Sequence, residues 1–191
     1  MPQDIFIEKI GGLSCEPISG FVVSEIRIAP VEWFTNIGKP KPMCDETPAN
    51  EATTFKELAE ITDDHTFVTD KGFMKLNALI ESVGLVSTLI GNKQRRLFEN
   101  KLNAILAGSG ADLIGFARWA KNKGFIVLAP EAESGNIRQI GSLAIPATIT
   151  EGEATIAPEL EGDNAFNYTF GDKNVSPAPI YKGLVTDIVI P

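Results

Sequence analysis

The chain has 191 residues, of which 43% are apolar, so it is long enough and apolar enough to fold as one domain with a buried core. Its 25 acidic and 17 basic residues give a net charge of −8, which argues against a protein that grips nucleic acid by neutralising phosphates. No apolar run reaches the roughly eighteen residues of a membrane-spanning helix, and the start, MPQDIFIEKIGG, lacks the basic segment of a secretory signal. Cys15 and Cys44 are too few for a disulfide framework or a zinc site, which predicts two reduced thiols in a cytosolic protein.

The first quarter of the chain is dominated by turn-forming residues. Glycines and prolines predict a loop-rich arm over 1–20, followed by an alternating apolar and polar pattern that predicts a strand over 22–34, interrupted at Pro30. Residues 35–53 contain three prolines and few apolar side chains, which predicts a long loop of the kind that is usually functional or disordered. Residues 54–68 fit either a short helix or a strand.

Strand signals become denser after Gly72. Residues 73–80 and 84–90 alternate in polarity and are separated by a short connection, so we expect them to form a hairpin. Residues 95–106 fit two structures. Intrinsic propensity and a 3.6-residue apolar period favour a helix, whereas a strand would place on one face four apolar side chains, Phe98, Leu102, Ala104 and Leu106.

A clearer helix is predicted over 111–123, within the stretch AGSGADLIGFARWAKNKG. Ser109 or Asp112 could cap its start, and Gly124 could close its end. Apolar residues recur at helical spacing and predict one packed face, with Arg118 and Lys121 turned outward. The residues of this face are Leu113, Phe116, Ala117 and Ala120.

The rest of the chain reads as short strands between glycine, proline and acidic turns. We expect a buried strand over 125–130, further strands over 136–142, 145–150, 153–160 and 166–172, and a final apolar segment over 181–191. The predicted fold is mainly antiparallel β, a sandwich or barrel with one packed helix. The terminal strand, 184–190, would present a pairing edge unless a neighbour covers it.

The sequence offers no constellation typical of catalysis, cofactor binding or a metal site. His65 is the sole histidine, and its neighbours Asp63 and Asp64 would point to opposite faces of a strand, so we expect a structural role. Nucleophile motifs, a Walker loop and a dinucleotide fingerprint are missing. The basic residues Lys93, Arg95 and Arg96 predict a solvated turn, and the two tryptophans, Trp33 and Trp119, are typical of core or interface anchors.

Several short motifs follow one another in a familiar order, namely SEIRIAPVEWF, HTFVTDKGFMKL, AGSGADLIGFARWAKNKGFIVLAP, IRQIGSLAIPATIT, NAFNYTFGD and SPAPIYKG. Together they span most of 22–183, and in this order the chain resembles the major tail tube proteins of tailed bacteriophages, particularly those of phages that infect Bacteroidetes. The resemblance implies a β-sandwich or barrel with one flanking helix, a strand in place of a helix over 95–106, and a hairpin turn at 91–94.

The same resemblance implies a non-enzymatic structural role. Such subunits, made in the host cytoplasm, form hexameric rings that stack into the hollow tube of the virion tail, through which DNA leaves the capsid. The implied partners are further copies of the chain, other tail proteins, and DNA passing through the lumen without specific binding. The tubes of contractile secretion and injection systems share this fold, so a tube outside a phage stays open.

Two physical expectations accompany this reading. An acidic lumen would repel phosphate and let DNA slide, and the loop 35–53 and the arm 1–20 would contact the next ring. The alternative is a monomeric β-sandwich module that binds carbohydrate or another ligand, which the wide spacing of the two tryptophans and two tyrosines disfavours. A hydrolase built on His65 comes third.

Overall fold

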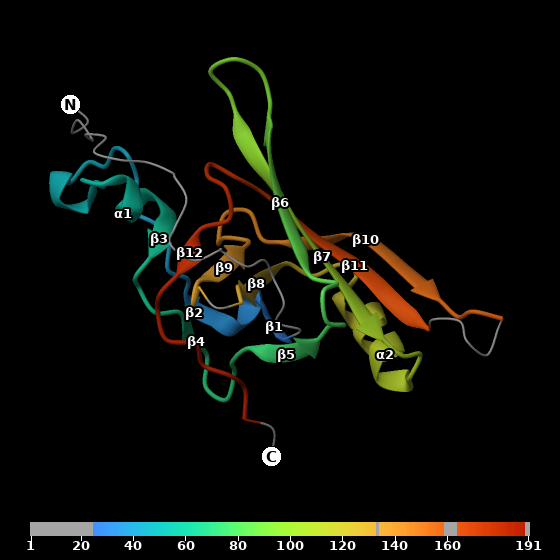
Figure 1. The fold of residues 1–191 in the computed structure, drawn as a ribbon. Coiled ribbons are helices and arrows are strands. Elements are labelled where there is room, and N and C mark those ends of the chain that lie inside the picture. The colour runs from blue at the N-terminus through green and yellow to red at the C-terminus, as the bar shows by residue number, and fades with distance from the viewer. Residues whose placement is uncertain (1–24, 133, 159–163, 190–191) are drawn as a thin grey trace.

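The structure is a computed structural model that describes residues 25–132, 134–158 and 164–189. Within these ranges the chain forms a six-stranded sheet, a four-stranded sheet and a small two-stranded sheet (Figure 1). The arm predicted over 1–20 lies outside the described residues. The two larger sheets pack face to face, so the predicted β-sandwich is confirmed.

The six-stranded sheet has its most buried strand near the middle. Its order is β3 (Glu60–Ile61), β12 (Ile180–Tyr181), β9 (Ile137–Ile140), β8 (Phe125–Pro130), β1 (Glu25–Pro30) and β5 (Met74–Asn77). All neighbours are antiparallel except β12 and β3. Strand β8 carries the sequence FIVLAP, and residues 125–129 are all buried. Because successive side chains point to opposite faces, β8 contributes to a core on each side of the sheet.

The four-stranded sheet is built on two long central strands. Its order is β10 (Thr148–Thr155), β11 (Ala165–Asn174), β7 (Leu97–Ala107) and β6 (Gly84–Ile90). Strands β7 and β11 stay in register from the pair Ala107 and Ala165 to the pair Phe98 and Asn174. Parts of the segments predicted as two strands, 145–150 and 153–160, are joined in the single strand β10, which has an irregularity between Ile149 and Glu151; residues 159 and 160 lie outside the described residues.

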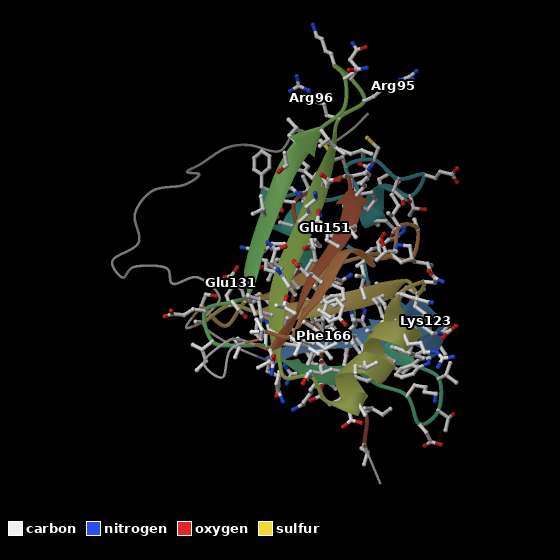
Figure 2. The ribbon with its side chains drawn as sticks, turned by 90° about the vertical axis from the view of Figure 1, so that its right-hand side faces the viewer. Arg95, Arg96, Lys123, Glu131, Glu151 and Phe166 are labelled. Atoms are coloured by element: carbon white, nitrogen blue, oxygen red, sulfur yellow. The ribbon has the colours of Figure 1, made fainter. Side chains whose placement is uncertain are left out.

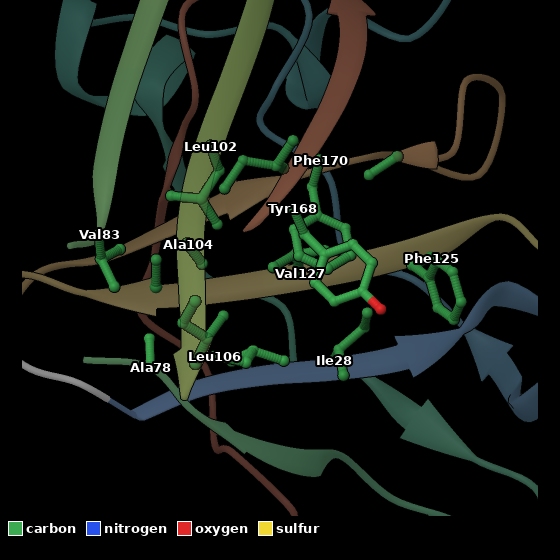
Figure 3. Close-up of a cluster of buried hydrophobic side chains, with 14 of the residues drawn as sticks. Ile28, Ala78, Val83, Leu102, Ala104, Leu106, Phe125, Val127, Tyr168 and Phe170 are labelled. Atoms are coloured by element: carbon green, nitrogen blue, oxygen red, sulfur yellow. The ribbon is translucent and has the colours of Figure 1, made fainter. Parts of the chain in front are cut away.

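The main core lies between these two sheets. In Figure 3, β7 crosses over β8 and β1, and side chains from both layers meet in the space between them. Large members of this cluster are Ile26 and Ile28 of β1, Val127 of β8, Leu102 and Leu106 of β7, and Tyr168 and Phe170 of β11. The alternation that places these side chains inward in every strand is the pattern on which the sandwich prediction rested.

A second core covers the opposite face of the six-stranded sheet. It contains Ile126 and Leu128 of β8 together with Ile61, Phe73 and Tyr181, and the partly buried Phe34 and Phe67 pack against it. The last two belong to the small sheet of β2 (Phe34–Asn36) and β4 (Thr66–Phe67). Two segments at the start of the chain can be compared with their predictions. The strand predicted over 22–34 is interrupted after Pro30, as expected, because a 3-10 turn, η1 (Val31–Trp33), separates β1 from β2. The ambiguous segment 54–68 contains both structures, since the short helix α1 (Phe55–Ala59) precedes β3 and β4.

The predicted helix is α2 (Ala111–Ala120), which lies at the end of β7 and packs on the main core (Figure 1). Its predicted inward face is confirmed, because Ala120 is buried and Leu113, Phe116 and Ala117 pack on the core, while Arg118 and Lys121 are exposed. The helix ends three residues earlier than predicted.

The predicted caps of α2 are wrong. Gly110 occupies the N-cap position without a side-chain hydrogen bond, so neither Ser109 nor Asp112 caps the helix. Gly124 does not adopt the left-handed conformation of a helix-ending glycine. A Cβ on Gly124 would lie 2.7 Å from the Cβ of Pro146, so this glycine permits a close approach between two loops.

The hairpin predicted from 73–80 and 84–90 is also wrong. Strand β5 pairs with β1 in one sheet, and β6 pairs with β7 in the other. Residues 78–83 carry the chain between the layers, with the buried Ala78 and Val83 at the crossing and Glu81 at a φ of 62°. Two strands that are close in sequence therefore belong to opposite layers of the sandwich.

Within the segment 95–106, residues 97–106 belong to strand β7, as the resemblance implied and against the helix that propensity favours, while 95 and 96 lie in the preceding turn. Strand β7 is hydrogen-bonded to β6 on one side and β11 on the other, and these neighbours decide its conformation. The turn between β6 and β7 spans 91–96, two residues more than the predicted 91–94.

The predicted terminal strand, 184–190, is not a strand in its described part, 184–189. Its backbone contacts Phe73 in a single parallel bridge at Asp187. The Phe73 amide donates to the Thr186 carbonyl at 2.9 Å, and the Ile188 amide donates to the Phe73 carbonyl at 2.9 Å. The segment is thus fastened to its own chain.

Candidate functional site

His65 is buried, with 4% of its surface exposed. Its Nδ1 accepts a hydrogen bond from the Gly38 amide at 3.1 Å, and its Nε2 lies 2.9 Å from Oε1 of Gln139. These partners fit a neutral ring that carries its proton on Nε2 and donates it to Gln139. Burial lowers the pKa of His65 below its usual 6.5, against the opposing effects of Gln139 and Asp64. The geometry makes His65 a structural link between the loop at Gly38 and β9.

The neighbouring aspartates do not join His65 in a ligand set. Oδ1 of Asp64 accepts a hydrogen bond from the Leu184 amide at 2.6 Å, which holds the segment after β12. In the described ranges no group of three or more histidine, cysteine, aspartate or glutamate side chains is arranged to hold a metal ion. Cys44 is an exposed free thiol, and Cys15 lies outside the described residues.

A buried polar network, which sequence reasoning missed, connects the two large sheets. Nδ2 of Asn100 donates to Oδ1 of Asp172 at 2.8 Å, and the Gly141 amide donates to Oδ2 of Asp172 at 2.7 Å. Oγ of Ser87 donates to Oδ1 of Asn100 at 2.6 Å, so β6, β7 and β11 are tied to the end of β9. Burial raises the pKa of Asp172 above its usual 3.8, although the hydrogen bonds from Gly141, Asn100 and Asn174 oppose this rise. In the sequence, this network is marked only by a polar residue at an inward-facing position of each strand, namely Ser87 of β6, Asn100 of β7 and Asp172 of β11.

The two tryptophans, which are far apart in sequence, lie together. The ring centroids of Trp33 and Trp119 are 6.2 Å apart and their planes are 48° apart. Nζ of Lys71 lies 5.0 Å from the Trp33 ring centroid, and Nζ of Lys123 lies 5.1 Å from that of Trp119. Tilted rings whose faces are met by ammonium groups make a packed cluster and do not form the flat, open platform that a sugar ring stacks on.

Two shallow hollows mark the surface of the sandwich. One, of about 310 Å³, lies beside β6 and is lined by Leu85, Ser87, Glu131, Arg138, Pro177 and Ala178. The other, of about 320 Å³, lies between α2 and β10, where Ala117 and Lys121 face residues 149–154. Tyr168 contributes to its wall, and the Tyr168 hydroxyl is buried without a hydrogen-bond partner. Neither hollow gathers a set of groups that would perform chemistry.

Both edges of the four-stranded sheet are open. In the part of the chain that the structure describes, β6 and β10 each have one strand neighbour and no partner on the other side. The face of this sheet that points away from the core is mostly polar on β7, β10 and β11, where it includes Glu99, Lys101, Asn103, Glu151, Glu153, Asn167, Thr169 and Lys173. It also carries the apolar residues Leu97 and Ile105 of β7 and Val86 and Ile90 of β6. Three carboxylates and two ammonium groups nearly balance, so this face is less acidic than the whole chain.

The β6–β7 hairpin projects from the body of the molecule, and its tip is basic. Figure 2 shows Arg95 and Arg96 at the tip with their side chains pointing away from the sheets. All residues from 91 to 96 are exposed, including Lys93. The predicted solvated turn is confirmed in this respect.

The long loop predicted over 35–53 is confirmed for 37–53, since residues 35 and 36 belong to β2, and one short 3-10 turn, η2 (Pro48–Asn50), interrupts it. Glu57 fastens it to α1, because its carboxylate accepts hydrogen bonds from the Thr53 amide at 2.6 Å and from Nζ of Lys41 at 2.9 Å. The Thr53 amide, then Lys41 and the Thr53 hydroxyl, lower the pKa of Glu57 to about 2. The Ala52 amide donates to the Pro42 carbonyl at 2.9 Å and closes the base of the loop.

Comparison with known proteins gives no relative: no family model, no curated protein and no solved structure matches the chain. In the described part of the chain, no helix is both long enough and apolar enough to cross a membrane. The features that call for a functional explanation are therefore the open edges, the polar outer face and the basic tip.

Proposed function

We propose that the protein is a structural subunit that assembles with its own copies into stacked rings, forming the hollow tube of a phage tail through which DNA leaves the capsid. The observation that carries the proposal is the four-stranded sheet, which has two open edges in the part of the chain that the structure describes and a mostly polar face turned away from the core. An open edge is a row of unpaired backbone donors and acceptors, and soluble proteins usually cover or disrupt such edges.

Pairing β6 of one copy with β10 of the next would satisfy both edges at once. Such a contact uses two different surfaces, so it repeats head to tail and closes into a ring when the rotation permits. The ring number of six comes from the resemblance alone. In this arrangement the polar outer face would line the lumen, and its nearly balanced charges would not hold DNA phosphates by counterion release.

Assembly and edge pairing are tested together by electron microscopy and light-scattering mass across concentration. Val86 is 58% exposed on β6, on the same sheet face as Glu151 and Glu153 of β10. Val86→Glu should leave a folded protein that no longer forms rings, because like charges would face each other across the new strand pair. The matched control is Val175→Glu, since Val175 is 81% exposed outside the strands.

A charge swap makes this test specific. Adding Glu151→Lys and Glu153→Lys to Val86→Glu should restore rings, because opposite charges across paired strands are favourable. A wild-type protein that stays monomeric at every concentration and with tail extracts present would contradict the proposal. Equal assembly by the Val86→Glu and Val175→Glu variants would contradict the edge pairing.

The loop 35–53 and the arm 1–20 are proposed to contact the next ring. The loop is suited to this role because it is fastened at its base, while its residues 43–50 are exposed. Gly38 and Ala52 are buried, so a deletion should spare them. Replacing 43–50 with two glycines should leave the melting temperature nearly unchanged and abolish stacking; tubes of normal length would contradict this role.

The runner-up function is a monomeric module that binds carbohydrate. The Trp33–Trp119 pair is its candidate aromatic contact, although the tilt of the rings and the two lysines over them disfavour sugar stacking. A glycan-array signal that Trp119→Ala removes, from a protein that never assembles, would place this function first.

A further inference from the structure

The tip of the β6–β7 hairpin concentrates positive charge on an acidic chain. Lys93, Arg95 and Arg96 lie within one six-residue turn, and the whole chain has a net charge of −8, so the rest of the chain carries −11. None of the three forms an ion pair within the described residues. Figure 2 shows the two arginines extended from the projecting tip into solvent.

The turn that carries these charges has a defined backbone. Gly91 has a φ of 91° and Gln94 a φ of 69°, and the Arg95 amide donates to the Asn92 carbonyl at 2.9 Å. A Cβ on Gly91 would collide with the Arg95 carbonyl oxygen, so the two ends of the turn are in direct contact. The cations are therefore presented from a closed turn, which limits the entropy lost when they bind.

The opposite end of the same hairpin is acidic. Glu81 lies in the segment just before β6. This segment is held beside the end of β7, because the Leu79 amide donates a hydrogen bond to the Ile105 carbonyl at 2.8 Å. Asp112 lies in the first turn of α2, which follows β7. Both carboxylates are exposed, and neither has an ion-pair partner in the described ranges. β7 has 11 residues, which at about 3.3 Å per residue separates the two charged ends by roughly 35 Å.

We propose that the basic tip, defined by Lys93, Arg95 and Arg96, docks on the acidic end, defined by Glu81 and Asp112, of another copy of this chain in the adjacent ring. This inference rests on the proposed self-assembly and names its axial contact. Opposite charges at the two ends of one hairpin make copies complementary when they align head to tail. DNA is a poorer partner, because the body behind a tip of three cations is negative and would repel phosphates.

The test reverses charge at the tip without disturbing the sheets. Arg95→Glu with Arg96→Glu is compared with Lys56→Glu with Lys173→Glu, which changes the net charge equally at exposed positions outside the hairpin tip and outside α2. Mass and electron microscopy are recorded at low and high NaCl. Wild-type stacks should shorten as salt rises, because the screening length falls from about 10 Å at 0.1 M to about 3 Å at 1 M.

The tip variant should form rings but need a protein concentration about tenfold or more higher to stack them, and the control pair should stack like wild type. Adding Glu81→Arg and Asp112→Arg to the tip variant should restore stacking, since the charges are then exchanged. Two results would overturn the docking: ring stacking by the tip variant at the concentration that wild type needs, or failure of the variant with all four substitutions to recover stacking.

The outcomes separate this inference from the proposed function. Wild-type protein that never assembles overturns both, whereas wild-type tubes that ignore the tip charges overturn only the docking. A gel-shift with duplex DNA serves as the remaining arm. Binding that the Arg95→Glu, Arg96→Glu variant loses, with stacking intact, would assign the tip to nucleic acid instead.

Discussion

The ring of His65 lies flat against the ring of Tyr181, with centroids 4.2 Å apart and planes 7° apart. The Tyr181 hydroxyl also accepts a hydrogen bond from the His65 amide at 3.0 Å and donates one to the Leu184 carbonyl at 2.8 Å. The pair therefore joins three segments, namely the turn before β4, strand β12 and the segment that follows it. We therefore expect His65, the only histidine of the chain, to contribute to the free energy of unfolding by holding these segments together.

Stability should depend on pH through His65. Because burial lowers its pKa below 6.5, the unfolded chain binds more protons than the folded chain just below that value. The unfolding free energy should therefore fall as the pH is lowered from 7 through this window. Urea titrations at several pH values measure the fall.

The matched variant is His65→Asn, which should be less stable at neutral pH but lose this part of the pH dependence. Subtracting its profile from that of wild type removes the contribution of Asp172, whose raised pKa gives the opposite slope at lower pH. Parallel profiles for the two proteins would show that His65 does not titrate on unfolding.

The two tyrosines should respond in opposite ways to loss of the hydroxyl. Tyr168→Phe removes a buried hydroxyl without a partner, so the unfolding free energy should rise by about 1 kcal/mol. Tyr181→Phe removes a hydroxyl that makes two hydrogen bonds, so it should fall by about 1–3 kcal/mol. Chemical denaturation of both variants checks the pair, and a loss of stability in Tyr168→Phe would indicate a partner for that hydroxyl.

Helix α2 should be stabilised mainly by its inward face. Phe116 is half-buried and packs edge-on against Tyr168, with ring centroids 5.9 Å apart. Phe116→Ala should lower the unfolding free energy by about 2–3 kcal/mol, less than the 3–5 kcal/mol of a fully buried phenylalanine. Ile114→Ala is the control on the outward face, where 54% of the side chain is exposed, and should change it by less than about 0.5 kcal/mol. Similar losses in both variants would contradict the assigned orientation.

Two glycines with positive φ should differ in their tolerance of a side chain. Gly141 has a φ of 93°, and its added Cβ would meet the Phe125 carbonyl oxygen and lie 2.7 Å from the Ala147 amide nitrogen. Gly141→Ala should lower the unfolding free energy by about 2–5 kcal/mol, from both strain and collision. Gly135 has a φ of 66° and open space around it, so Gly135→Ala should lower it by only about 1–2 kcal/mol. Thermal melts rank the two, and equal losses would leave strain alone as the cause.

Alternation of apolar residues was enough to predict the sandwich and most of its strands, because inward side chains follow the period of two. It could not predict which strands pair. Residues 73–90 look like a hairpin, yet Ala78 and Val83 bury the crossing between layers, and no local signal distinguishes a crossing from a turn. For 97–107, helix propensity favoured the wrong structure, since pairing with β6 and β11 outweighs a preference of a few tenths of a kcal/mol per residue.

The candidate surfaces were less predictable than the fold. The basic turn was visible as a cluster of cations, but its projection depends on the lengths of β6 and β7. Trp33 lies in η1 and Trp119 in α2, so their contact depends on tertiary packing that their separation in the sequence does not reveal. The network of Asn100 and Asp172 needed the register of β7 against β11, in which these two residues are opposite each other.

Because strand β8 contributes to both cores, its side chains are apolar on both faces, and we expect it to promote aggregation while the chain is being synthesised. Its run FIVLA is uncharged, rich in β-branched and aromatic residues, and typical of segments that aggregate when unprotected. Its partner β1 lies about 100 residues earlier in the chain and its other partner, β9, follows it, so protection requires contacts of high sequence separation, which form slowly. Lys123 and Glu131 flank the run at either end as charged gatekeepers. Variants that delay the pairing of β1 with β8 should therefore reduce soluble yield before they reduce the stability of the folded subunit.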